Sequence, residues 1–154
     1  MDSFHVLTPI GAMLARFRGD VLIELNFVDE QEPARASDPR AVKLQEELNA
    51  YFDGGKEKFE TPVAPTGSRF QQRVWQLLQA IPYGATRSYL DLAKELGDSG
   101  LTRAVGRANA TNPVAILIPC HRVIRSDGDL CGYAGGLWRK ERLLLIEGAQ
   151  LALF

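Results

Sequence analysis

The segment with the clearest chemical potential is Ile118–Ile124, in which Cys120 is followed directly by His121 and Arg122. Cysteine reacts as its thiolate, and an ordinary thiol pKa of about 8.5 leaves only a few per cent in that form at neutral pH. A nucleophilic cysteine therefore needs a base or a cation beside it. His121 and Arg122 are such groups, but neighbours in sequence need not have side chains that meet. On these residues alone, a buried structural Cys120 remains an equal alternative.

The elements that must position this segment begin with a small sheet. Three short apolar runs are separated by turn residues, which predicts strands joined by tight antiparallel turns: the runs are 4–7, 13–17 and 21–27. Asp38 and Pro39 are typical of a helix start, and the apolar side chains from Val42 to Phe52 predict one helical face. This sheet and helix make up the predicted first lobe.

A proline-rich and glycine-containing stretch, 61–67, predicts a linker, so we expect one domain over 1–65 and a second over 66–154. Ser68 and Gln71 fit a capping box at the start of a helix that ends near Ile81. Trp75 in this helix, and Trp138 further on, are expected in the core or in packing contacts.

Two further helices, at 88–96 and 101–110, with glycines between them, have the outline of a helix-turn-helix. Many helical hairpins share this outline without binding DNA. The second helix combines small residues with Arg103 and Arg107, which would let a backbone approach a groove while cations meet phosphates. Tight packing against the core is the alternative explanation of its small residues.

The remaining elements follow the same local patterns. The apolar run 114–118 predicts a buried extended segment, 123–133 predicts a hairpin, and 137–147 predicts a last helix. The predicted fold class is therefore α/β: an N-terminal lobe with an antiparallel sheet and a helix, and a mostly helical C-terminal lobe that holds the helix-turn-helix and Cys120.

Charge is distributed unevenly along the 154 residues, although the net charge is only −1. Residues 1–65 carry 7 Lys and Arg against 12 Asp and Glu, and residues 66–154 carry 11 against 7. The second part is therefore the candidate surface for an anionic partner, whereas two simply solvated surfaces are the alternative. No run of apolar residues is long enough for a membrane span, and the start of the chain has no signal-peptide pattern, so we expect a cytoplasmic protein.

The sequence Pro119-Cys120-His121-Arg122-Val123 resembles the active-site motif of the O6-alkylguanine-DNA alkyltransferases, a family also called methylated-DNA–protein-cysteine methyltransferases. Flanking segments resemble the same family in order along the second lobe: Phe70-Gln71-Gln72-Arg73-Val74-Trp75, Ile81-Pro82-Tyr83-Gly84, Ser88-Tyr89, Arg103-Ala104-Val105-Gly106, Asn112-Pro113, Tyr133-Ala134-Gly135-Gly136-Leu137 and Glu147-Gly148. The first lobe resembles the family more weakly.

The resemblance implies that Cys120 accepts an alkyl group from O6 of guanine, with alkylated thymine as a further candidate substrate. It implies that His121 relays the thiol proton through water and that Glu147 accepts a hydrogen bond from His121. Because a thioether is a very poor leaving group, each molecule would act once. Asn112 resembles the residue that ties the second helix of the helix-turn-helix to the active-site turn.

The resemblance also implies how damaged DNA is held. The target base must leave the stack before sulfur can reach it, and Arg103 would fill the vacated place. Tyr89 would crowd the target phosphate and donate a hydrogen bond to the departing guanine. The helix around Arg103 is expected in the minor groove, where further contacts are expected from Thr102, Ala104, Gly106 and Arg107.

The pocket for the displaced base is expected at Tyr133, Val123, Ala134 and Gly135. Tyr133 would wall the pocket, while the Val123 carbonyl and the Ala134 backbone N–H would contact guanine. Ala134 stands where many members of the family have serine, which leaves the range of accepted alkyl groups open. Cys131 matches no motif and has no assigned role.

The expected partner is double-stranded DNA that contains O6-alkylguanine, bound by a monomer without cofactor or metal; whether monomers bind cooperatively along DNA is left open. With two cysteines and two histidines in all, two of them assigned to the reaction, a structural zinc site is not expected. Two alternatives remain. A lesion-binding module without transfer would carry another residue in place of Cys120, and a cysteine hydrolase would turn over repeatedly.

Overall fold

The computed structural model describes residues 1–29, 36–55 and 58–149. Their contacts divide the chain into two units: the described residues of Met1–Thr66 together with Pro113–Leu117, and Gly67–Asn112 together with the described residues from Ile118 onward. The first break lies close to the expected boundary at residue 65. Assignment of Pro113–Leu117 to the first unit differs from the expectation that 66–154 forms one lobe.

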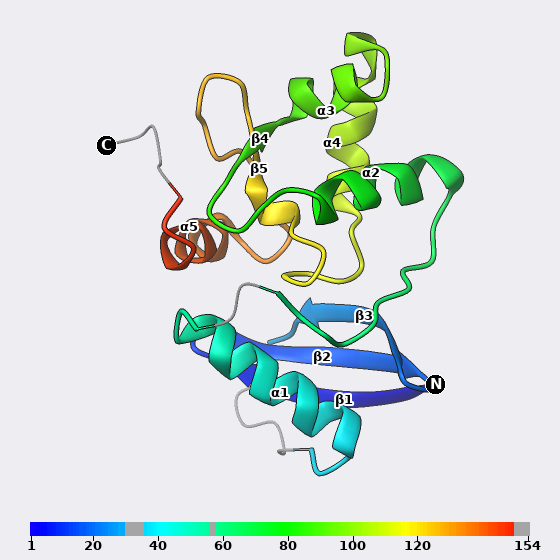
Figure 1. The fold of residues 1–154 in the computed structure, drawn as a ribbon, viewed down its shortest axis with the longest axis vertical. Helices are drawn as coiled ribbons and strands as arrows, with labels where there is room; N and C mark the ends of the chain where they lie inside the picture. The colour runs from blue at the N-terminus through cyan, green and yellow to red at the C-terminus, as the bar shows by residue number, and fades with distance from the viewer. Residues whose placement is uncertain (30–35, 56–57, 150–154) are drawn as a thin grey trace. The chain divides into compact units, whose positions relative to one another are not determined.

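The first unit contains the predicted antiparallel sheet, in the order β1-β2-β3 (Figure 1). Its strands are β1 (Asp2–Thr8), β2 (Gly11–Arg18) and β3 (Val21–Phe27). The apolar side chains of β2 at Met13, Ala15 and Phe17 alternate along the strand and are buried, so one face of the sheet forms the core of this unit.

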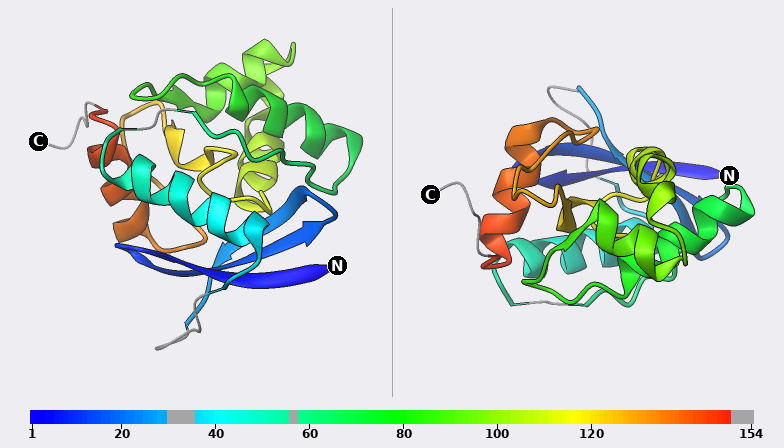
Figure 2. Two further views of the ribbon diagram at one scale, coloured as in Figure 1. Left: turned by 60° about the horizontal axis from the view of Figure 1, so that its bottom comes forward. Right: turned by 90° about the horizontal axis from the view of Figure 1, so that it is seen from above.

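Helix α1 (Pro39–Phe52) packs on the sheet, and the N-cap side chain of Asp38 accepts a hydrogen bond from the Arg40 N–H. Gln45 attaches the helix to β1, because its amide both donates to the Leu7 carbonyl and accepts from the Leu7 N–H. The helix and its sheet can be followed in both views of Figure 2.

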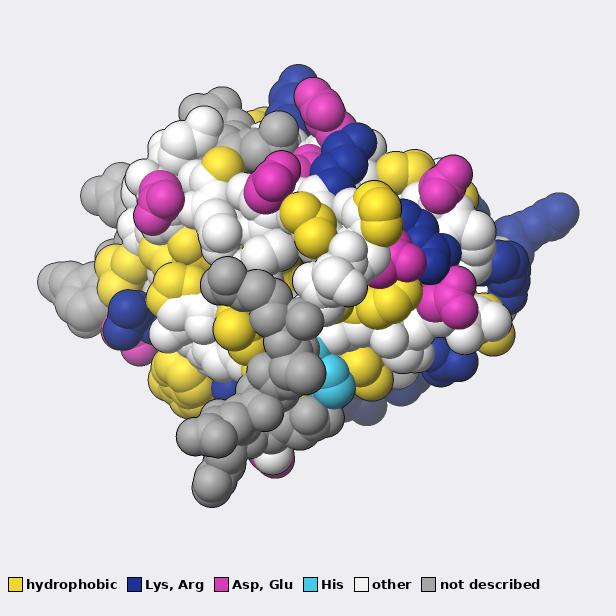
Figure 3. Space-filling model, turned by 90° about the horizontal axis from the view of Figure 1, so that it is seen from below, with side chains coloured by type: hydrophobic (Ala, Val, Ile, Leu, Met, Phe, Trp, Pro, Cys, Tyr) yellow, Lys and Arg dark blue, Asp and Glu magenta, His cyan; other side chains and the backbone are white. Residues whose placement is uncertain are grey.

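On the face of the molecule in Figure 3, acidic and basic side chains are interspersed with hydrophobic ones.

The segment after Asn112 departs from the predicted extended conformation. It is buried, as expected, and Val114 forms an isolated parallel bridge with Leu25. Beyond this bridge the chain turns, and Ile116 adopts a positive φ of 72°. The apolar pattern correctly indicated burial, but a run of apolar residues does not distinguish a strand from a buried turn.

The second unit is mostly helical. Its elements are α2 (Arg69–Gln79), β4 (Arg87–Ser88), α3 (Tyr89–Glu95), the 3₁₀ turn Ser99–Leu101, α4 (Thr102–Ala110), the 3₁₀ turn Cys120–Arg122, β5 (Val123–Ile124) and α5 (Leu137–Ile146). Helix α4 packs against both α2 and α3. Trp75 fixes α2 to α4, since its buried indole N–H donates to the Ala108 carbonyl at 2.8 Å. The outline of a helix-turn-helix is thus formed by α3 and α4.

Two predictions for this unit are wrong in part. The expected hairpin at 123–133 does not form: β5 instead pairs in parallel with β4, and the chain after it makes a turn closed by Arg125 and Asp129. Trp138 lies on the surface with 52% of its area exposed, and the Arg139 guanidinium lies over its ring. Neither the pairing of β5 with a distant strand nor the contact between Trp138 and Arg139 can be predicted from the residues next to them in sequence.

The capping box at the start of α2 is the one expected from the sequence, and it makes the stability of the second unit testable. Ser68 Oγ accepts from the Gln71 N–H, and the Gln71 side chain accepts from the Ser68 N–H. Replacing Ser68 with Ala is expected to lower the free energy of unfolding by about 1 kcal/mol. Denaturant titration checks this, with the exposed Ser126→Ala as control; equal stability of the two variants would contradict it.

Candidate active site

Cys120 begins a 3₁₀ turn whose backbone is fixed by hydrogen bonds within the turn and by two side-chain amides from the end of α4. Its own N–H donates to the Ile118 carbonyl at 2.8 Å, and the Arg122 N–H donates to the Pro119 carbonyl. Asn112 and Asn109 approach from the end of α4: the Asn112 amide donates to the Ile118 carbonyl at 2.7 Å and the Asn109 amide to the Cys120 carbonyl at 3.4 Å. The helix of the helix-turn-helix is therefore hydrogen-bonded to the turn that presents the thiol.

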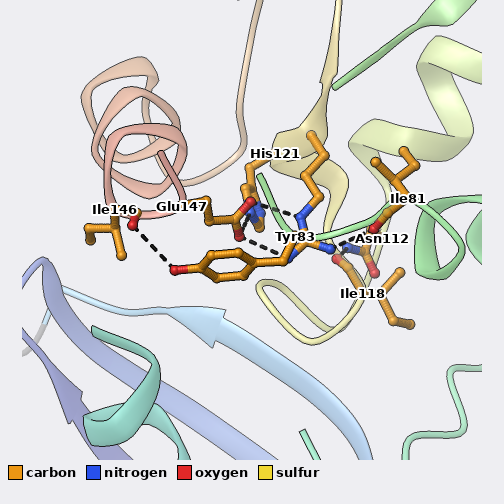
Figure 4. A network of polar contacts seen from close by, with 8 residues as sticks. Ile81, Tyr83, Asn112, Ile118, His121, Ile146 and Glu147 are labelled. Atoms are coloured by element: carbon orange, nitrogen blue, oxygen red, sulfur yellow. Dashed lines mark hydrogen bonds and ion pairs between the residues drawn. The ribbon is translucent and has the colours of Figure 1, made fainter. Parts of the chain in front are cut away.

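His121 and Glu147 are brought together in a buried polar network, shown in Figure 4. His121 Nε2 lies 2.7 Å from Glu147 Oε2. Arg122 donates to both oxygens of the same carboxylate, from Nε at 2.8 Å and from a terminal nitrogen at 2.9 Å, and its other terminal nitrogen donates to the Ile81 carbonyl. One carboxylate thus orients an imidazole and neutralises a guanidinium.

The Tyr83-Gly84 motif lies against the same network. Tyr83 donates from its hydroxyl to the Ile146 carbonyl, and its ring lies 5.8 Å from the Arg122 guanidinium carbon. Gly84 has a positive φ of 83°, and a Cβ at this position would lie 3.1 Å from the Glu147 carbonyl oxygen. Only glycine combines this conformation with so close an approach to the end of α5.

The protonation state of His121 follows from its surroundings. Burial lowers the pKa of His121, while the bond to Glu147 opposes this shift. A neutral imidazole beside an ionised carboxylate donates from Nε2, which leaves Nδ1 as the unprotonated nitrogen. Nδ1 is buried and makes no hydrogen bond to any residue that the structure describes. His121 is therefore arranged to take up a proton at Nδ1.

Cys120 is itself buried, and this burial raises the pKa of its thiol. The shift is opposed by a hydrogen bond from Asn112, by the charge of Lys140 and by the nearby Tyr133 hydroxyl. The resting group is then mainly the thiol, and a reaction at neutral pH needs a base to remove its proton. His121 is the neutral base adjacent to it in the chain.

Two phenols accompany the thiol. Burial, with smaller contributions from Cys131 and Cys120, raises the pKa of Tyr89 to about 12. Burial likewise raises the pKa of Tyr133 well above its ordinary value. Both hydroxyls therefore keep their protons at neutral pH and can act as hydrogen-bond donors.

The residues expected to contact DNA are placed on α4 as follows. Arg103 and Arg107 are exposed, while Val105 and Ala108 on the opposite side are buried. Thr102 closes the first turn by donating to the Ser99 carbonyl, and Ala104 and Gly106 are half-buried. A Cβ at Gly106 would lie 3.9 Å from the Tyr89 ring, so this position brings α3 close to α4. The two cations stand one helical turn apart on the exposed side.

The expected pocket residues lie on β5 and on the segment before α5. Val123 is buried, Gly135 is half-buried and accepts from the Arg139 guanidinium at 2.8 Å, and Ala134 is exposed. Tyr133 is half-buried, and its hydroxyl makes no hydrogen bond to any residue that the structure describes, but it lies close enough to Cys120 to lower the thiol pKa.

Sequence reasoning missed two buried cations. Arg122 belongs to the recognised motif, but its bidentate bond to Glu147 was not expected. Lys140 is fully buried, and its Nζ donates to the Val123 carbonyl at 2.6 Å. Lysine at a helix position is usually exposed, so no local pattern distinguishes it from the basic residues around it. Asn109, the second amide that reaches the turn, gave no signal either.

No group of three or more His, Cys, Asp and Glu side chains in the described part of the chain is placed to hold a metal ion. Within the same residues, no helix is both long and apolar enough to cross a bilayer. Cys120 and Cys131 are both free thiols.

Comparisons with known proteins agree with this geometry. Residues 69–149 match the family model "6-O-methylguanine DNA methyltransferase, DNA binding domain". The chain is 47% identical to a methylated-DNA–protein-cysteine methyltransferase of Mycolicibacterium paratuberculosis, over 96% of this chain and 94% of the relative. It is 41% identical to one from Methanosarcina acetivorans, over 92% of this chain and 95% of that relative.

Solved structures give the same result. The crystal structure of Mycobacterium tuberculosis OGT in complex with DNA superposes with a TM-score of 0.86 at 42% identity, covering 95% of this chain and 92% of that one. The O6-methylguanine methyltransferase of the same organism superposes with a TM-score of 0.85 at 38% identity, covering 99% and 95%. The predicted α/β fold is confirmed, and the chain belongs to the methylated-DNA–protein-cysteine methyltransferase family.

Proposed function

We propose that this chain repairs DNA by moving an alkyl group from O6 of guanine in duplex DNA onto its own Cys120. Family membership makes it a DNA-binding alkyltransferase. The observation that supports Cys120 as acceptor is the buried series of side chains behind it, in which Glu147 fixes His121 with Nδ1 as the free basic nitrogen. An inert structural cysteine has no need of an oriented base.

The proposed reaction proceeds in one displacement. The Cys120 thiol gives its proton to His121 Nδ1, through an intervening water, because no direct bond joins the two groups among the described contacts. The thiolate then attacks the alkyl carbon, so that the S–C bond forms while the C–O6 bond breaks. The electron pair goes to the guanine, to which Tyr89 can donate because its pKa of about 12 keeps it protonated.

Binding is assigned to the second unit. Arg103 and Arg107 offer exposed cations on α4, and the amides of Asn112 and Asn109 connect this helix to the Cys120 turn. We place α4 in the minor groove, with the target base rotated into a pocket made by Tyr133, Val123, Ala134 and Gly135. Minor-groove contact suits a protein that must find lesions in any sequence.

We also infer a cytoplasmic location. The proposed acceptor must remain a free thiol until it meets a lesion, and both Cys120 and Cys131 are unpaired in this structure. A reducing compartment preserves that state.

The experiment that tests the function is mass spectrometry of the intact protein after incubation with a duplex containing one O6-methylguanine. The expected result is a gain of one methyl group per molecule, mapped to Cys120 by peptide analysis, with no transfer beyond one equivalent of DNA. An unmodified protein after prolonged incubation, or many lesions repaired per molecule, would contradict the proposal.

Arg103→Ala tests the role of α4 in rotating the base. Unstacking a base costs a few kcal/mol, and each 1.36 kcal/mol lost from the transition state slows a reaction about tenfold. We expect transfer from duplex DNA to slow by about tenfold or more, while reaction with a free O6-alkylguanine base changes little. Single-turnover rates on the two substrates provide the measurement.

Arg107→Ala is the matched control for this variant, since it removes the same exposed charge one turn further along α4. It is expected to weaken DNA binding and to reduce its salt dependence by about one unit of slope, with little effect on the rate at saturating DNA. Equal slowing of the duplex and free-base reactions by Arg103→Ala would remove Arg103 from the base-rotation step.

A further inference from the structure

Lys140 is the fully buried ammonium of the second unit, and the reaction described above makes no use of it. Its side chain has no exposed area, and its Nζ donates to the Val123 carbonyl at 2.6 Å and to the Gly132 carbonyl at 3.3 Å. Among the described residues it forms no ion pair with a carboxylate, whereas the other buried cation, Arg122, is neutralised by Glu147. Burying an ammonium on two carbonyls alone is costly, because neither carries a full negative charge.

The two carbonyls belong to different parts of the proposed site. Val123 directly follows the 3₁₀ turn that starts with Cys120, and Gly132 precedes Tyr133 in the segment that leads to α5. One ammonium therefore ties the strand behind the nucleophile to the wall of the pocket. The Val123 carbonyl is also the oxygen proposed to accept from guanine, and a carbonyl oxygen has a second lone pair for that contact.

The charge of Lys140 acts on the same groups. It lies over the Tyr89 ring, 6.0 Å from the centroid, and it favours the ionised form of Cys120. Burial lowers the pKa of Lys140 to about 8, while the thiols and Asp129 oppose that shift. Below that pH the ammonium is charged, and its charge lowers the pKa of a thiol that must become an anion to react.

We propose that Lys140 is a positioning residue of the transfer reaction, which holds the strand after Cys120 to the base pocket and stabilises the Cys120 thiolate with a buried positive charge. The inference rests on the proposed function, in which Cys120 reacts as a thiolate. It explains why an ammonium is buried here without a carboxylate: the missing counter-charge is the thiolate itself, formed only during reaction.

The other titratable groups around the thiol are either neutral near pH 7 or paired with one another. Several titratable or charged groups lie near Cys120 or Lys140. They are the phenols Tyr89 and Tyr133, the side chains Cys131 and Asp129 of the segment before α5, and the buried network of His121, Arg122 and Glu147. The two phenols stay neutral near pH 7, and Arg122 is bound to Glu147. Lys140 is therefore the cation whose removal should change thiolate formation most directly.

The test uses Lys140→Gln, which keeps an N–H donor for the carbonyls but removes the charge. The rate of Cys120 alkylation by iodoacetamide is measured against pH without DNA, in a Cys131→Ser background so that a single thiol reacts. At pH 7, where Lys140 of the parent protein is charged, the variant is expected to react about tenfold more slowly, because less thiolate is present. Above the Lys140 pKa of about 8 the parent loses the same charge, so the two rates should converge.

Further variants separate charge from packing. Lys140→Met, which has neither charge nor donor, should show the same loss of alkylation rate at pH 7 and, in addition, slower transfer from a methylated duplex at high pH. Lys140→Arg should return the alkylation rate at pH 7 towards that of the parent protein. Arg142→Gln, an exposed position on the same helix, is the control and should leave the profile unchanged.

An unchanged rate of Cys120 alkylation at pH 7 in folded Lys140→Gln or Lys140→Met would overturn the inference. Circular dichroism establishes which of the two variants is folded, and either one is sufficient for the decision. Because iodoacetamide needs no DNA, the pH profile remains decisive even if the parent protein takes no methyl group from the duplex. That second result would contradict the proposed function, and it would leave standing only the effect of the Lys140 charge on the Cys120 thiol.

Discussion

Replacing Cys120 with Ser abolishes alkyl transfer while DNA binding persists: this is the largest effect that the structure leads us to expect. A serine hydroxyl is a far weaker nucleophile than a thiolate, and neutral His121 can ionise it only to a negligible extent. The side chain is buried, so it contributes no phosphate contact. Intact-protein mass spectrometry should show no methyl gain, and the dissociation constant for methylated duplex should stay within about twofold of the parent value.

Cys131→Ser is the matched control, because it removes the chain's other thiol from an exposed position. It should take up one methyl group per molecule as the parent protein does. Methylation of the Cys120→Ser variant, at any residue and at the parent rate, would show that the acceptor lies elsewhere. Loss of DNA binding together with transfer would show instead that the substitution disturbs the fold of the turn.

Much of the local structure could be predicted because its causes are local. Short apolar runs between turn residues predicted the three strands, and the capping box at Ser68 predicted the start of α2. The meeting of His121 with Glu147 was expected only through the family resemblance. Spacing along the chain could not have supplied it, since the two residues are 26 positions apart.

The parts that could not be predicted depend on distant partners. The parallel pairing of β5 with β4 joins residues that are far apart in sequence, so the segment around 123–133 was taken for a local hairpin. Arg122 and Lys140 are charged residues whose burial is possible only because Glu147 and backbone carbonyls meet them in the folded chain. Residue type alone favours exposure for both.

These distant contacts are also the ones that make the site reactive. Two of the buried parts of the site are satisfied by other elements: the carbonyls of the Cys120 turn by the amides of Asn109 and Asn112, and Arg122 by the Ile81 carbonyl and Glu147. The same carboxylate that neutralises Arg122 sets the tautomer of His121. Stability and reactivity therefore depend on one residue at the end of α5.

Glu147→Gln should reveal both dependences at once. The substitution leaves the Arg122 guanidinium buried without its counter-charge, and breaking a buried pair in this way costs about 3 kcal/mol or more of the free energy of unfolding. An amide can also donate to His121 Nε2, so the tautomer with a basic Nδ1 is no longer enforced. Below its unfolding temperature the variant should transfer methyl groups about tenfold or more slowly, as expected when the partner of a functional histidine is lost.

Denaturant titration and single-turnover transfer rates measure the two effects separately. Glu95→Gln is the matched control: it removes a carboxylate from an exposed pair with Arg87 at 3.4 Å, and pairs of this kind contribute about 1 kcal/mol or less. A Glu147→Gln protein as stable as Glu95→Gln would show that Arg122 finds another partner. A destabilised protein that still transfers at the parent rate would show that His121 needs no carboxylate to act as the base, because the neutral imidazole would then select the reactive tautomer unaided.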